Sequence, residues 1–131
     1  MMPNKDIPSF ARQIAETYGG YPLSVTALAK NAGIKVIENR HVNDLLPGEH
    51  GKVYYDGEDW IIIFDETRTT EQMRFTVAHE LGHCFLKHNE EHRAFLAHIE
   101  KLKDKHGRRV DRQADLFARC LLSSRGTKER I

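Results

Sequence analysis

The sequence predicts a small α+β domain, and three observations support this fold class. Apolar residues make up 40% of the 131 residues and charged residues 30%, an ordinary composition for a soluble chain with one core. Helical periodicity occurs near the N-terminus and again in the second half. Three short runs of β-branched or apolar residues lie between these parts. We therefore expect a single domain over residues 1–131, with a frayed tail from about residue 123.

Two helices are expected before the strands. The first, over residues 7–20, places apolar side chains on one face and stops at Gly19-Gly20. The second fits residues 24–33, where Ser24 can serve as the N-cap and Gly33 as the stop.

Three strands are predicted at residues 34–38, 52–55 and 60–64. The first two are rich in β-branched and aromatic residues, and the third, WIIIF, is a continuous apolar run typical of a covered strand. Residues 56–59, DGED, suggest a hairpin turn between the last two strands, and residues 39–51 suggest a loop.

Three helices are predicted for the remainder of the chain. Thr69 or Thr70 can cap a helix that runs to about His88. Residues 90–106 fit a mostly solvated helix, and residues 109–122 fit a last helix with an apolar face.

Charge and cysteine content restrict the environment and the partners that we expect. The formal net charge is +1, and the basic stretch 101–109 is best explained as a solvated helix end, so direct binding of nucleic acid is not expected. No apolar run is long enough to span a bilayer, and the first residues lack the layout of a secretory signal. Two cysteines are too few for a disulfide framework, so we expect a cytoplasmic protein. We expect no membrane partner.

The motif of greatest chemical interest is HELGH, residues 79–83. Residues four apart lie on the same face of a helix, so His79 and His83 can reach one metal ion. Zinc suits imidazole ligands, and a catalytic zinc site keeps one position for water. Glu80 can take the proton from that water as the general base. Gly82, which lacks a side chain, is expected to leave room near the metal.

A third protein ligand is needed, and the neighbours in sequence fit poorly. His88 is nine residues after His79 and would point away from it on a continuing helix. Cys84 points about 100° away from the face that carries the histidines.

The last predicted helix offers better candidates. Asp111 and Asp115 fall within its apolar face, one helical turn apart on the same row, and two carboxylates there need a cationic partner. We interpret Asp111 as the metal ligand and Asp115 as the acceptor of a hydrogen bond from a ligand histidine. The exchanged assignment remains open, whereas Gln113 is expected to lie away from the apolar face.

These stretches resemble the ImmA/IrrE family of small bacterial zinc metallopeptidases. The resemblance is carried by RFTVAHELGHCFLKH (74–88) and DRQADLFARCLL (111–122), and it extends over most of residues 8–122. It implies a zincin-like fold and Zn²⁺ as the cofactor. Position by position, Asp111 matches the family's Glu ligand, and Asp115 matches its Asn/Asp.

The resemblance also suggests a function. Members of the family often relieve repression by cleaving a helix-turn-helix repressor of a mobile element or stress regulon. We therefore expect a zinc-dependent intracellular endopeptidase whose substrate is a protein, in the first instance such a repressor. A substrate bound in extended form would pair with a sheet edge, at 52–55 or 60–64.

Two departures from the family pattern support an alternative function. Asp111 is one methylene shorter than Glu, and the chain reads LLSSRGTKERI where the family often continues LLMP into an extension. The alternative is a regulatory binding protein that keeps the fold and cleaves little. The presence of Glu80 favours the enzyme.

Overall fold

The computed structural model describes residues 2–20, 22–86 and 105–123, and it has the predicted α+β architecture. Its order begins with helices α1 (Ile7–Tyr18) and α2 (Val25–Asn31), followed by strands β1 (Lys35–Glu38), β2 (Gly51–Tyr55) and β3 (Trp60–Phe64). Helices α3 (Thr70–Phe85) and α5 (Lys105–Ser123) complete the described part. Short 3-10 turns lie at Asn4–Asp6 and Asn39–His41.

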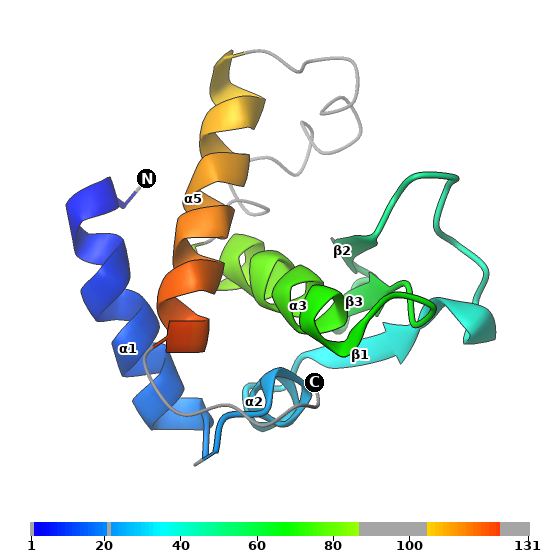
Figure 1. The fold of residues 1–131 in the computed structure, drawn as a ribbon, viewed down its shortest axis with the longest axis horizontal. Helices are drawn as coiled ribbons and strands as arrows, with labels where there is room; N and C mark the ends of the chain where they lie inside the picture. The colour runs from blue at the N-terminus through cyan, green and yellow to red at the C-terminus, as the bar shows by residue number, and fades with distance from the viewer. Residues whose placement is uncertain (1, 21, 87–104, 124–131) are drawn as a thin grey trace.

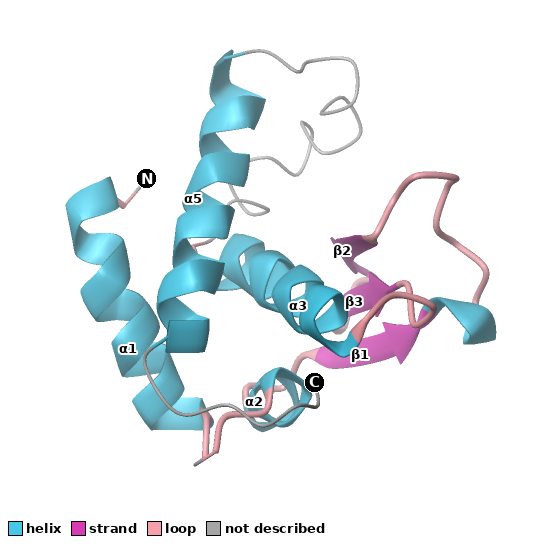
Figure 2. Ribbon diagram, viewed as in Figure 1, coloured by secondary structure: helices cyan, strands magenta, loops and turns pink. Residues whose placement is uncertain are grey.

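The elements form layers around α3. Figure 1 shows α3 between the sheet on one side and the pair α1 and α5 on the other. Figure 2 shows that the strands lie together on one side of the molecule, while the long helices occupy the other side. Helix α3 therefore packs against the sheet on one side and against α5 on the other. Its remaining face can carry a functional site.

The three strands form one mixed sheet in the order β1-β3-β2. Strand β3 pairs in parallel with β1, with Val36 opposite Ile62, and in antiparallel with β2, with Val53 opposite Ile62. Central β3 is the apolar run WIIIF, and its residues Ile61 to Phe64 are all buried. Because β3 is central, the expectation that a substrate could pair with residues 60–64 is wrong. Of the two strands predicted for this role, only β2 lies at an edge of the described sheet.

Local sequence signals explain where the helices begin. Ser24 caps α2 by accepting a hydrogen bond from the backbone of Ala27 at 3.3 Å. Thr69 and Gln72 form a reciprocal capping box at the start of α3, with hydrogen bonds of 3.2 and 3.1 Å. Both arrangements satisfy backbone N–H groups that the first turn of a helix leaves without a partner.

Two predicted helix boundaries differ from the structure. Helix α3 ends at Phe85 rather than near His88, and α5 begins at Lys105 rather than at residue 109. The earlier start carries α5 through Gly107, which has a low helix propensity that suggested a break there. The expected helix over 90–106 falls outside the described residues except for its last two, and the tail falls outside them after Ser123.

The core of α5 includes residues that the sequence pattern did not place there. Phe117 is fully buried, and its ring lies 6.2 Å from that of Phe10 and 6.0 Å from that of Phe85. Gln113 is 2% exposed, so the expectation that it lies away from the buried face is wrong. Its Nε2 donates to the carbonyl of Met2 and to Oδ1 of Asn4, both at 2.8 Å. These bonds satisfy a polar group that would otherwise be costly to bury.

Gly82 allows α3 and α5 to approach each other closely. A Cβ at this position would lie 3.0 Å from Cα, 3.1 Å from the carbonyl oxygen and 3.3 Å from Cβ of Ala114. The expectation that Gly82 leaves room near the metal is therefore wrong, because its open side faces the backbone of α5. The glycine costs helix propensity but permits the contact that holds the two helices together.

We predict that Gly82→Ala destabilises the protein although it raises helix propensity by about 1 kcal/mol. Overpacking against a backbone costs roughly 1–3 kcal/mol, so a net loss of about 1 kcal/mol is expected in a urea titration. Gly20→Ala is the control, since nothing lies within 4 Å of the position of its added Cβ. Equal midpoints for the two variants would contradict the tight contact.

Candidate metal centre

The two histidines lie on one face of α3, as their spacing predicts. Their Nε2 atoms are 3.2 Å apart, and their ring centroids are 4.8 Å apart. Both side chains are largely buried, which restricts the orientations that the rings can adopt. On the opposite side of α3, Val77 and Leu81 are fully buried in the core. The packed face therefore fixes the direction in which the histidines point.

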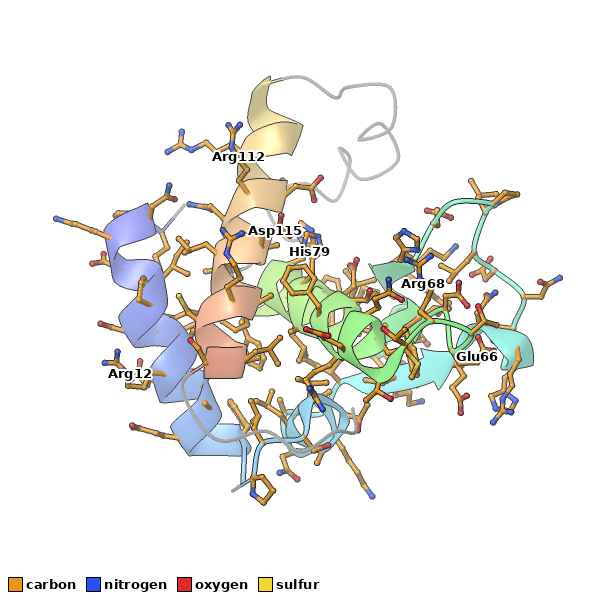
Figure 3. The ribbon with its side chains drawn as sticks, viewed as in Figure 1. Arg12, Glu66, Arg68, His79, Arg112 and Asp115 are labelled. Carbon is orange, nitrogen blue, oxygen red and sulfur yellow. The ribbon has the colours of Figure 1, made fainter. Side chains whose placement is uncertain are left out.

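Helix α5 brings the two predicted aspartates to the histidines. Oδ1 of Asp111 lies 3.1 Å from Nε2 of His83 and 3.5 Å from Nε2 of His79. Oδ1 of Asp115 lies 2.6 Å from Nδ1 of His79, which donates the hydrogen bond. Figure 3 shows Asp115 and His79 meeting where α5 crosses α3. The pattern had placed both carboxylates within the apolar face, but they lie at its edge, and the side chain of Asp111 is 61% exposed.

The three candidate ligand atoms match the size of a zinc site. With zinc bonds of about 2.0–2.1 Å, tetrahedral geometry places ligand atoms about 3.3 Å apart. The separations among the two Nε2 atoms and Oδ1 of Asp111 are 3.1, 3.2 and 3.5 Å. His79, His83 and Asp111 also form a cluster of potential metal ligands within the described part of the chain. The donor set therefore fits a zinc ion without rearrangement of the helices.

Asp115 has a different position from Asp111 relative to the rings. It contacts Nδ1 of His79, whereas Nε2 of the same ring faces His83 and Asp111. A carboxylate on the outer nitrogen of an imidazole fixes the ring and leaves the other nitrogen available as a ligand. In this geometry Asp111 faces the two Nε2 atoms and Asp115 the outer nitrogen of His79, and the division of roles between the two aspartates stays a prediction.

Glu80 is a buried acid beside the metal cluster. It is 8% exposed, and burial raises the pKa of its carboxyl group, while the charges of His83 and His79 act in the opposite direction. Gly51, at the start of β2, lies close to Thr76 and Glu80 of α3, because a Cβ on Gly51 would be 3.7 Å from Cγ of Glu80. The edge strand thus passes directly beside the candidate general base. Sequence patterns alone did not reveal this approach, since Gly51 was assigned to a loop.

The electrostatics of the cluster favour a bound cation. Burial lowers the pKa of His79, but its hydrogen bond with Asp111 and the charges of Glu80 and Asp115 raise the pKa to about 9. Hydrogen bonds from His79 and His83 hold the pKa of Asp111 well below its usual range. Three carboxyl groups therefore surround two imidazoles, and positive charge stabilises this arrangement.

Cys84 and His88 were the other ligand candidates close to the histidines in sequence. Cys84 is not among the grouped ligands, and burial raises the pKa of its thiol to about 12, which disfavours the thiolate that binds metals. His88 lies outside the described residues.

Within the described ranges, no helix has the length and apolar character required to cross a bilayer.

The fold and the cluster define a zincin-like domain with an HExxH helix, and comparison with known families agrees. Residues 29–125 match the model of the IrrE N-terminal-like domain, a peptidase family. This match covers more than half of the chain, so the protein belongs to that family of metallopeptidases. The comparison with curated proteins finds no match.

The two aspartates should differ in their effect on metal binding. We predict that Asp111→Ala lowers zinc affinity more than Asp115→Ala, because the first removes a ligand and the second a supporting hydrogen bond. Loss of such a supporting partner typically costs 10–100-fold. The measurement is a competitive chelator titration, with Arg112→Ala as a control on the same helix. The opposite order would exchange the two roles.

Proposed function

We propose that the protein is a zinc-dependent endopeptidase that hydrolyses a peptide bond in a protein substrate. The observation that carries this proposal is the cluster of His79, His83 and Asp111 beside buried Glu80, in a chain of a peptidase family. When bound, zinc lowers the pKa of water and polarises a carbonyl group. The two histidines and Asp111 would hold the ion, and Asp115 would orient His79 by accepting a hydrogen bond from its Nδ1.

Glu80 performs the proton transfers in this proposal. It accepts a proton from the attacking water, whose oxygen adds to the carbonyl carbon of the scissile peptide. It then gives a proton to the leaving nitrogen as the C–N bond breaks, so that the products are a carboxylic acid and an amine. A raised pKa suits this role, because the carboxyl group must both accept and release a proton near neutral pH.

Strand β2 supports the proposal of a substrate bound in extended form. It forms one edge of the described sheet, and its first residue, Gly51, lies beside Thr76 and Glu80. A peptide that pairs with this edge gains main-chain hydrogen bonds and passes the cluster. Main-chain pairing accepts many sequences, so a specific protein partner is also required. We propose a helix-turn-helix repressor for this role, on the basis of the resemblance described above.

A regulatory binding protein that cleaves little remains the competing function. The exposed position of Asp111 favours it, since a ligand open to solvent holds a metal less firmly. Glu80 favours the enzyme, because an acid that is costly to bury has a reason to be there when it serves as a base. Cleavage and binding can be measured separately, which distinguishes the two functions.

We predict that Glu80→Gln retains zinc but loses cleavage, because the amide cannot accept a proton. The assay incubates the zinc-loaded protein with a purified helix-turn-helix repressor from the same genome and detects fragments by mass spectrometry. We expect one defined cut with the unmodified protein and a reduction of at least about 100-fold in the variant.

The control is the zinc content of the two proteins, which should be equal. Equal cleavage by Glu80→Gln would exclude Glu80 as the base. Binding of the repressor without any cut would favour the regulatory function, whereas neither binding nor a cut would reject this partner.

A further inference from the structure

A pocket lies along the first turns of α3, on the N-terminal side of the metal cluster. Its volume is about 570 Å³, within the range of small-ligand sites, and its lining includes Phe75 and Thr76 of α3 and Leu122 of α5. Phe75 lies one helical turn before His79, and Thr76 one turn before Glu80. The pocket and the candidate catalytic face thus occupy consecutive turns of one helix.

Helix α5 supports the same placement. Along α3 toward its start, His83 is next to Asp111 and His79 is next to Asp115. Successive contacts therefore run in opposite order along the two crossing helices, and Leu122 follows Asp115 by about two turns. The pocket therefore lies beyond the metal cluster, toward the N-terminus of α3 and the C-terminus of α5.

The start of the edge strand leads into this pocket. His50 lines it, and the next residue, Gly51, is the one that approaches Thr76 and Glu80. A peptide paired with β2 would point alternate side chains to the same side. The pocket lies one helical turn, or about 5.4 Å, from the metal cluster. An extended peptide rises about 3.3 Å per residue, so the side chain that enters the pocket belongs to a residue one to three positions from the cleaved bond.

The charged residues of the lining determine which kind of substrate side chain the pocket favours. Among the described lining residues, Arg68 and Arg74 carry positive charge, and Glu71 is the one acidic side chain. Figure 3 shows Arg68 on the segment that leads into α3, on the side of the sheet. Phe75 and Leu122 add apolar surface that can contact the stem of a side chain. An acidic side chain with an aliphatic stem complements both features.

We propose that this pocket selects substrates with a glutamate or aspartate within about three residues of the cleaved bond, an inference that rests on the proposed peptidase function. Arg68 binds the carboxylate, Arg74 adds positive charge, and the apolar wall contacts the methylene groups. This pocket supplies the side-chain specificity that main-chain pairing with β2 lacks.

The test separates binding from cleavage by using the Glu80→Gln protein. Zinc-loaded Glu80→Gln is immobilised and used to select from a displayed library of randomised ten-residue peptides, which are then sequenced. We expect enrichment of Glu or Asp over Gln or Asn at one position, by about five- to tenfold for a partly exposed charged contact. Arg68→Glu on this background should remove or reverse the preference toward Lys and Arg.

Matched variants control for effects on folding and on overall charge. Arg12→Glu makes the same charge change at an exposed position of α1, remote from the pocket, and should keep the preference (Figure 3). Arg68→Gln tests the loss of the contact without placing a negative charge near Asp65, whose carboxylate is stabilised by the charge of Arg68. Glu71→Gln removes the opposing charge and should strengthen the acidic preference.

Several results would overturn the proposal. These are no acidic enrichment, no selected peptide, or an unchanged preference in both Arg68 variants. Synthetic copies of the selected peptides are then given to the zinc-loaded protein with Glu80 intact. A charge preference without cleavage would contradict the proposed peptidase function but support the pocket. Cleavage without a charge preference would support the peptidase function but contradict the proposed role of the pocket.

Discussion

The close contact between α3 and α5 is the constraint on which the site depends. Two histidines on α3 cannot complete a metal site, and Asp111, the proposed third ligand, comes from a helix about thirty residues later in the chain. The approach is possible because Gly82 presents no side chain to the backbone of Ala114. Buried Phe117 and the hydrogen bonds of Gln113 fix α5 on its other side. The geometry of the site therefore follows from how closely these helices pack.

The same packing explains why an acid can be buried in this core. Glu80 is 8% exposed, and its burial is unfavourable for the charged form. His79 and His83 offset part of this cost, and Asp111 and Asp115 make the surroundings more negative. A divalent cation between the helices would compensate all three carboxyl groups. In the proposed site, metal binding and the protonation of Glu80 are thus linked, because both depend on the charges of the same cluster.

The local features of the fold could be predicted from the sequence, because short-range patterns determine them. Ser24 and Thr69 cap their helices as expected, and the run WIIIF forms the covered central strand. The shared face of His79 and His83 follows from helical spacing alone. Contacts between distant segments were less accessible: Gly82 faces α5, Gln113 is buried, and Gly51 lies beside Glu80. Each depends on how helices and strands pack, which residue spacing does not encode. The nearness of Asp111 and Asp115 to the histidines was an exception, since carboxylates beside an apolar face required a positive partner.

The central claim is that two imidazoles and one carboxylate of this chain bind a single zinc ion. X-ray absorption spectroscopy of the zinc-loaded protein tests it most directly, because the method identifies the atoms around the metal. We expect one zinc per chain, with nitrogen and oxygen ligands at about 2.0–2.2 Å and two of them from histidine. A sulfur ligand at about 2.3 Å, or a spectrum unchanged in Asp111→Ala, would contradict it.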